Sequence, residues 1–428
     1  IIHRVNMIWF ISKNLLNKHL VIYSIFFLSL ISFFIGFELR ENSAGGGIID
    51  LKHEWHNYNL LKENKLGFLF GNYEASRFPF FHLINIYINP FISTKSDYIF
   101  SFFIYSFFLI FIFYLSLIKV FKKQNKSVIF LFLSTLLFSP YFRTSSFWGL
   151  QENLAYIFFL LSITLYEKDS KNTFLIIFVS FLSFYSDQKF IFVPLFFLLK
   201  LFNKKEFISF NNQKLFIYAL ALSIPAIIIF YLWGGITKSE TTSGINEFSF
   251  RPQNIIFTIN IIALYLLPFY ILFHYKNKLS NFYAKKNLIN ISLFIIFYFL
   301  IRFYFIDDNL PISGGWSFKV FRFLLSYNYI LSEIIFFLIS LFSFLLLYFY
   351  FGFFIKSILN KLLLLFLIIF PLSMEIVFQE YFDPLMLFII IFFIHKDDIK
   401  KIDVERTFFI FLYFFLFWFS TLSYYLLI

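Results

Sequence analysis

The sequence predicts an all-α integral membrane protein, and three observations lead to that fold class. Only 14% of the 428 residues are charged, whereas a soluble domain carries about 25%. Hydrophobic residues make up 60% of the chain and the mean hydropathy is +0.79, so lipid must be the solvent for much of the surface. The apolar residues also fall into long uninterrupted runs. Together these features predict one polytopic membrane domain over residues 1–428, with roughly 11–14 transmembrane helices.

The apolar runs account for about thirteen crossings. They lie at 20–37, 98–118, 127–140, 153–166, 173–185, 190–202, 215–233, 254–273, 288–306, 325–350, 362–378, 385–394 and 407–427. Four of them, 127–140, 173–185, 190–202 and 385–394, are shorter than the ~20 residues that a full span needs. We expect these four to extend into neighbouring polar segments, or to re-enter the membrane sheltered by other helices.

The basic residues predict the orientation in the membrane. One set of alternate connections, together with the N-terminal segment, holds 23 of the 36 Lys and Arg residues. By the positive-inside rule this set is cytoplasmic, which also places the N-terminus inside. The protein is then expected in a cell inner membrane or an ER-type membrane. The polar segment from Glu38 to Asp97, a large first loop, becomes extracytoplasmic.

Several classes of function and cofactor are not expected. The net charge of +12 is explained by membrane topology, so lipid rather than nucleic acid is the expected partner. The absence of Cys excludes disulfides and thiolate metal sites. His53 and His56 are three positions apart, but only Asp50 and Glu54 could complete a metal site there, so we expect no metal. No phosphate-binding loop or dinucleotide fingerprint is present.

The loop from Glu38 to Asp97 is the only long polar segment of the chain. Seven acids lie in it, and Asp50 and Glu54 would be one turn apart on the same face of a helix. One interpretation is a solvated loop whose acids face water. Our working hypothesis is that the loop caps an active site at the membrane surface, with Asp50 as the reactive carboxylate and Glu54 as its neighbour.

Further charged residues lie in short connections on the same predicted side. Polar groups near membrane depth are costly and are candidates for function. The basic candidates for binding a phosphate are Arg77, Arg143, Lys189, Arg302, Lys319 and Arg322. The acidic candidates for the same cavity are Glu152, Asp187, Glu380 and Asp383, and Asp307, Asp308 and Glu375 lie in the same connections. The alternative interpretation is that these Lys and Arg side chains reach lipid headgroups from helix ends.

Read together, these segments resemble the GT-C superfamily of polytopic glycosyltransferases. The first extracytoplasmic loop of that superfamily carries the catalytic acid, and Asp50 matches its position. Five stretches carry the resemblance: Asp50 with Glu54 and Trp55, Ser76–Leu83, Ser139–Pro140 with Trp148–Asn153, Asp187–Pro194, and Gln379–Pro384. The last two are similar to the branch of eukaryotic terminal α-1,2-glucosyltransferases of lipid-linked oligosaccharide assembly.

The resemblance implies a membrane glycosyltransferase that takes sugar from a polyprenyl-phosphate donor and passes it to a glycan acceptor. Asp50 would be the general base, and no cofactor or metal would be needed. Two alternatives remain open at this stage. One is a polysaccharide polymerase or ligase of the O-antigen type, which would depend more on Arg in later loops. The other is a transporter or flippase of a lipid or anion, which would place charges at the bilayer midplane.

Overall fold

The structure is a computed structural model that describes residues 18–70, 73, 77–121, 126–202, 209–235, 250–274, 285–306, 315–374 and 377–427. Every regular element within these ranges is a helix and none is a strand, as the sequence predicts. Glu74, Asp307, Asp308 and Glu375 lie outside the described residues.

Seven helices in this described part are long and apolar enough to cross a membrane. They are α1 (Lys18–Glu38), α5 (Lys95–Val120), α11 (Phe210–Trp233), α13 (Gln253–His274), α14 (Lys285–Phe305), α16 (Tyr329–Phe349) and α20 (Val404–Leu427). Only 11% of the most apolar window of α11 is buried inside the protein. Such an exposed apolar surface requires lipid around it, so the chain is an integral membrane protein.

The other helices are shorter. They are α2 (Gly47–Glu63), α3 (Gly67–Phe70), α4 (Phe80–Ile88), α6 (Lys126–Leu137), α7 (Pro140–Trp148), α8 (Glu152–Lys168), α9 (Thr173–Ser186), η2 (Gln188–Ile191), α10 (Phe192–Leu201), α15 (Gly315–Leu325), η4 (Tyr350–Phe354), α17 (Ile358–Ile369), η5 (Phe370–Ser373), η6 (Gln379–Tyr381), α18 (Leu385–Ile389), η7 (Ile390–Ile394) and α19 (Lys396–Ile399). Among the described residues, each of the thirteen apolar runs lies largely on helical segments, and the four short runs form short helices. α6 and α7 would together make an eighth span, bent by 63° at the break between them.

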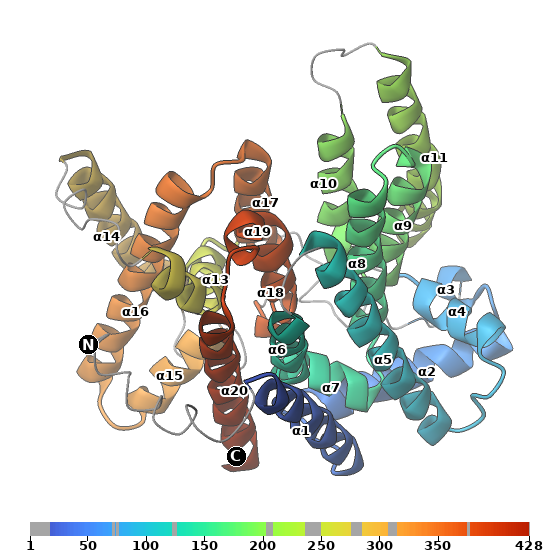
Figure 1. Cartoon of the computed structure of the whole chain (residues 1–428), viewed down its shortest axis with the longest axis horizontal. Coiled ribbons are helices and arrows are strands. Elements are labelled where there is room, and N and C mark those ends of the chain that lie inside the picture. The colour runs from blue at the N-terminus through green and yellow to red at the C-terminus, as the bar shows by residue number, and fades with distance from the viewer. Residues whose placement is uncertain are drawn as a thin grey trace.

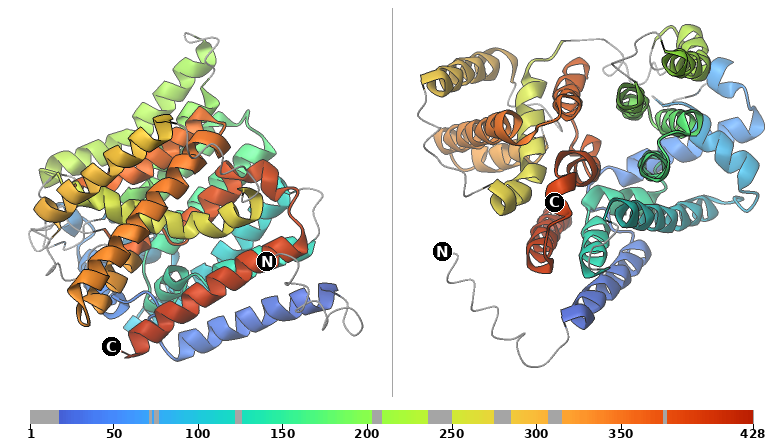
Figure 2. Two further views of the ribbon diagram at one scale, coloured as in Figure 1. Left: turned by 90° about the vertical axis from the view of Figure 1, so that its left-hand side faces the viewer. Right: turned by 45° about the horizontal axis from the view of Figure 1, so that its top comes forward.

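The helices form two groups with a few elements between them, as Figure 1 shows. In one group α8 packs on α5 and α9, and in the other α16 packs on α13 and α15. α6, α18 and α20 lie between the groups (Figure 1). α6 contacts both α1 and α20, and Figure 2 shows these two long helices along one face of the molecule. The candidate site forms near α7, where the central elements meet the first loop.

Candidate functional site

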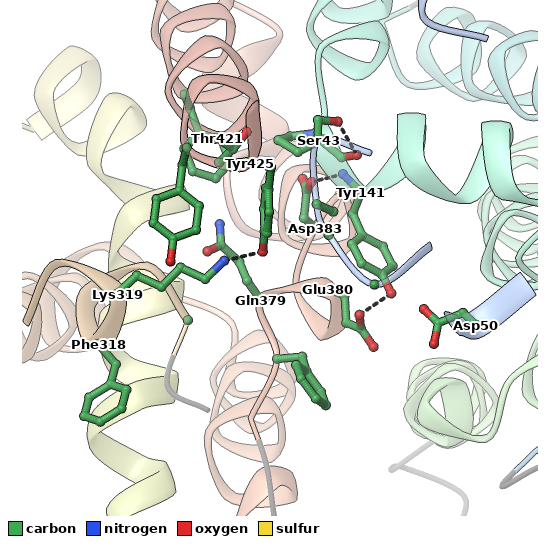
Figure 3. Close-up of a pocket in the computed structure, with 18 of the residues that line it drawn as sticks. Ser43, Asp50, Tyr141, Phe318, Lys319, Gln379, Glu380, Asp383, Thr421 and Tyr425 are labelled. Atoms are coloured by element: carbon green, nitrogen blue, oxygen red, sulfur yellow. Dashed lines mark hydrogen bonds between the residues drawn. The ribbon is translucent and has the colours of Figure 1, made fainter. Parts of the chain in front are cut away.

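A cavity of about 740 Å³ lies where the start of α2, α7, α15, η6 and the end of α20 come together. Its lining includes acidic and basic side chains, and Figure 3 shows them on different walls. Asp50 lies on one side with Glu380 and Tyr141 close to it, and Lys319 with Tyr425 lies on the other. Asp50, Lys319 and Asp383, which the sequence analysis places on one side of the membrane, thus line one cavity.

Three glycines place Asp50 on the cavity wall. Gly45 and Gly46 have φ values of 79° and 78°, in the left-handed region that favours glycine. A Cβ added to Gly45 would lie 2.6 Å from the ring of Tyr425, and one added to Gly47 would lie 2.6 Å from Trp148. The chain therefore turns sharply between α7 and α20, with no room for a side chain at Gly45 or Gly47. α2 begins at this turn, so Asp50 in its first turn lines the cavity.

Glu41 fastens the preceding part of the loop. Its carboxylate accepts hydrogen bonds from Arg143 Nε at 2.8 Å and from Trp418 Nε1 at 2.9 Å. Its backbone oxygen accepts one from Trp148 Nε1 at 3.0 Å. Arg143 is 1% exposed and also donates to the carbonyls of Ser32 and Leu137. Arg143 therefore joins α1, α7 and the loop, and it does not line the cavity.

Asp50 and Glu380 are two carboxylates on the same part of the wall. Burial, reinforced by the charge of Glu380, raises the pKa of Asp50 to about 7. Burial also raises the pKa of Glu380, while the charge of Lys189 opposes that rise. The hydroxyl of Tyr141 donates to Glu380 Oε2. Among the described residues, neither Asp50 nor the other oxygen of Glu380 has a hydrogen-bond donor. Both acids can therefore accept a proton or a hydrogen bond from a ligand.

Asp383 also lines the cavity, but its carboxylate is used within the protein. Oδ2 accepts hydrogen bonds from Ser139 Oγ and from the backbone nitrogen of Tyr141, both at 2.9 Å. These donors form the N-terminus of α7, where a carboxylate is stabilised by free N–H groups. Burial raises the pKa of Asp383 to about 6 despite these bonds. Asp383 therefore ties the 377–384 segment to α7.

Lys319 and Arg322 supply positive charge on the opposite wall. They are three positions apart on α15, which places them on the same face of the helix, and both line the cavity. Lys319 Nζ donates to the hydroxyl of Tyr425 and lies 4.4 Å from the centre of its ring. Within the described residues Lys319 contacts no carboxylate. Burial lowers its pKa to about 8, so it is still mostly charged at neutral pH.

The other predicted phosphate-binding residues are paired with carboxylates of the protein itself. Arg77 Nη1 lies 2.7 Å from Glu152 Oε1, and Lys189 Nζ lies 3.2 Å from Asp187 Oδ2. Arg302 pairs with Glu333 between α14 and α16. The structure therefore brings Lys319 and Arg322 to the cavity, and it places Arg77, Arg143, Lys189 and Arg302 in ion pairs elsewhere.

Glu54 lies behind the cavity wall. His82 Nε2 is 3.0 Å from its Oε2, and Arg77 Nη1 is 3.8 Å from its Oε1. Gln151 Nε2 donates to the same Oε1 at 3.4 Å. Of the two acids one turn apart on α2, Asp50 alone lines the cavity. Glu54, Glu152 and Asp187 instead belong to a buried charge network beside it.

Sequence reasoning missed three side chains that shape the site. Glu41 was counted only as one acid of the loop, and its role depends on Arg143 and Trp418, which are far away in sequence. Tyr141 directly follows Ser139–Pro140, which the sequence analysis names, so its neighbourhood was indicated. Tyr425 carries no signal in the sequence beyond an aromatic residue near a helix end.

Within the described ranges, no group of three or more His, Cys, Asp or Glu side chains is arranged to hold a metal ion. The fold and the site together define a polytopic helical membrane protein with a cavity that is acidic on one wall and basic on another. Comparison with protein-family models, with curated proteins and with solved structures found no match. The function is therefore argued from the chemistry of the cavity.

Proposed function

We propose that this protein is a membrane glycosyltransferase that transfers a sugar from a polyprenyl-phosphate donor to an acceptor hydroxyl at the extracytoplasmic surface. One observation carries the proposal: Asp50, a carboxylate with a pKa near 7, stands across a single cavity from Lys319. A general base works best when its pKa lies near the operating pH. A cation in a partly buried site is suited to a phosphate.

The size of the cavity fits this substrate. Small-molecule sites usually enclose about 300–1,000 Å³, and this cavity of about 740 Å³ falls in that range. The sugar and its phosphate would occupy the space between the two walls. The polyprenyl chain would lie in the bilayer, because the surrounding helices expose large apolar surfaces.

The reaction needs one proton acceptor and one stabilised leaving group. The acceptor hydroxyl oxygen attacks the anomeric carbon as the bond from that carbon to the phosphate oxygen breaks. Asp50 takes the proton of the hydroxyl, and the bonding electrons leave with polyprenyl phosphate. Lys319 and Arg322 stabilise the charge on the leaving phosphate. In comparable sites one preorganised donor contributes about 2.7–4 kcal/mol to the transition state.

The test is transfer by Asp50→Asn, measured by mass spectrometry of lipid-linked and acceptor-linked glycans in cells with the wild-type or variant chain. This substitution keeps the shape and removes the basicity, so transfer should fall by about 10²–10⁴-fold while donor binding survives. Glu63→Gln, at the exposed end of α2, is the matched control and should transfer sugar normally. Full activity of Asp50→Asn together with loss in Glu54→Gln would make Glu54 the base.

The same experiment separates the alternatives. A flippase would move lipid across the membrane without any acceptor and would form no covalent product. The Asp50→Asn substitution would then cause no loss of such a product. A polymerase or ligase would lengthen or join chains carried on a diphosphate lipid, which the mass of the lipid-linked species reveals. If glycans are the same with and without this protein, the glycosyltransferase proposal is wrong.

A further inference from the structure

The polarity of the cavity bears on which sugar it accepts, given the function proposed above. Negative groups are concentrated on the wall that includes Asp50, Glu380 and Tyr141, away from Lys319 (Figure 3). A donor whose phosphate lies beside Lys319 and Arg322 must therefore extend its sugar ring toward the carboxylates. The ring is then the part of the donor that meets the acidic wall.

Glu380 is fixed in this wall rather than loosely placed. The hydroxyl of Tyr141, on α7, donates to its Oε2, and Lys189 lies 5.9 Å from the centre of the adjacent Tyr381 ring. The same segment is held to the start of α7 through Asp383. The remaining oxygen of Glu380 is thus a preorganised hydrogen-bond acceptor, on a residue that lines the cavity.

The charged residues behind the acidic wall do not cancel the negative charge of its carboxylates. The charges of Glu380, Glu152 and Glu54 all act on Asp50 in the direction that favours its protonated form, and Arg77 opposes them. Arg77 is itself shared between Glu152 and Glu54. A further carboxylate brought in by a ligand would meet Asp50 and Glu380, whose nearest cations, Arg77 and Lys189, are already paired with Glu152 and Asp187. Such contacts between like charges discriminate strongly between ligands.

We infer that this end of the cavity selects a sugar without negative charge and rejects a sugar that bears a carboxylate, with Glu380 as the specificity-determining residue. The free oxygen of Glu380 accepts a hydrogen bond from a hydroxyl or amino group of the ring. A uronic acid presents an acceptor and a negative charge at the same place. The selection acts on the donor sugar and requires no covalent step.

The experiment compares binding of two matched probes to the full-length protein in lipid nanodiscs. Citronellyl phosphate linked to a hexose and the same lipid linked to the corresponding hexuronic acid differ in one group. Both are used in the gluco and galacto configurations, and tryptophan fluorescence at pH 7.5 reports binding. The hexuronate should bind at least tenfold more weakly than its hexose. In Glu380→Gln, which keeps the shape of the residue, this gap should shrink at least threefold.

Two further variants test whether the difference in binding comes from the charges of the acidic wall. Asp50→Asn should also narrow the gap in binding, because it removes a second charge from the same wall, whereas Glu63→Gln at the exposed end of α2 should leave it intact. Equal binding of hexose and hexuronate to the wild type would overturn the selectivity and leave the donor proposal standing. Binding of neither probe would instead reject the polyprenyl-phosphate donor, and the selectivity with it.

Discussion

Asp50 and Lys319 should together set the pH range of activity. Asp50 must be deprotonated to act as a base, and its pKa is raised to about 7. Lys319 must be protonated to hold a phosphate, and its pKa is lowered to about 8. The rate of transfer at limiting donor should therefore rise up to about pH 7 and fall above about pH 8. Measured pH–rate profiles should lose the falling limb in Lys319→Arg, because arginine stays charged. A falling limb that is unchanged in this variant would remove Lys319 from the assignment.

Removing the charge of Lys319 should weaken donor binding and also slow the chemistry at saturation, because the same side chain stabilises the leaving phosphate. A hydrogen bond to a charged group contributes about 1.5–3 kcal/mol, so Lys319→Met should raise KM for the donor by about 10–100-fold. Steady-state kinetics with a short-chain polyprenyl-phosphate sugar would measure this. Lys52→Met, on the exposed face of α2, is the control. A similar rise in that variant would point to nonspecific attraction of the anionic donor.

The environment that makes Asp50 a base should also cost stability. Its folded-state pKa of about 7 exceeds its ordinary value of 3.8, so between these values the folded state binds more protons than the unfolded state. Stability therefore falls as pH rises from about 4 to about 7. Asp50→Asn should melt at a higher temperature than the wild type at pH 8. Its gain in the free energy of unfolding should be a few kcal/mol at most, with little difference near pH 4. A lower melting temperature of Asp50→Asn at pH 8 would contradict a destabilising charge on Asp50 in the folded state.

At the scale of the elements, α7 determines how the first loop meets the cavity. It is short and polar, and its residues from Pro140 to Phe147 are buried. Its N-terminus binds Asp383, while Arg143 in its second turn binds Glu41. One helix therefore holds both the loop that carries Asp50 and the segment that carries Glu380.

Breaking the Arg143–Glu41 pair should loosen this arrangement. Arg143→Met leaves Glu41 as a buried charge without its partner, which typically costs about 3–5 kcal/mol. Thermal unfolding of the detergent-solubilised protein should show the loss. The double variant Arg143→Met with Glu41→Gln should recover part of it, because no unpaired charge remains. If both variants melt alike at the wild-type temperature, the pair does not fasten the loop.

At the scale of the whole molecule, the cavity is expected to open on the extracytoplasmic side. The expectation rests on the 23-to-13 division of basic residues. Because the chain contains no Cys, single cysteines can be labelled cleanly. Lys62→Cys on α2 should react with an impermeant maleimide in intact cells, whereas Lys168→Cys at the end of α8 should react only after the membrane is opened. The reverse pattern would invert the orientation.

The sequence by itself determined the fold class and the helical segments. A long apolar run in lipid must satisfy the hydrogen bonds of its own backbone. A helix does so, since each backbone hydrogen bond is made within the segment. Asp50 was also a candidate from the sequence, because it lies in the only long polar loop, one turn from Glu54. The sequence likewise indicated the aromatic and Pro-containing 379–384 segment, but not its place in the cavity.

Only the tertiary structure decided which charged residues belong to the cavity. Arg143, Arg302 and Lys319 look alike in sequence, since each is a cation in a short connection or near a helix end. Arg143 and Arg302 are neutralised by Glu41 and Glu333, and Lys319 meets the rings of Tyr424 and Tyr425. Asp50 and Glu54 also differ in their surroundings: Asp50 lines the cavity, whereas Glu54 contacts His82 and Arg77 behind the cavity wall. The partner of a charge comes from residues distant in the chain, and only packing brings the two together.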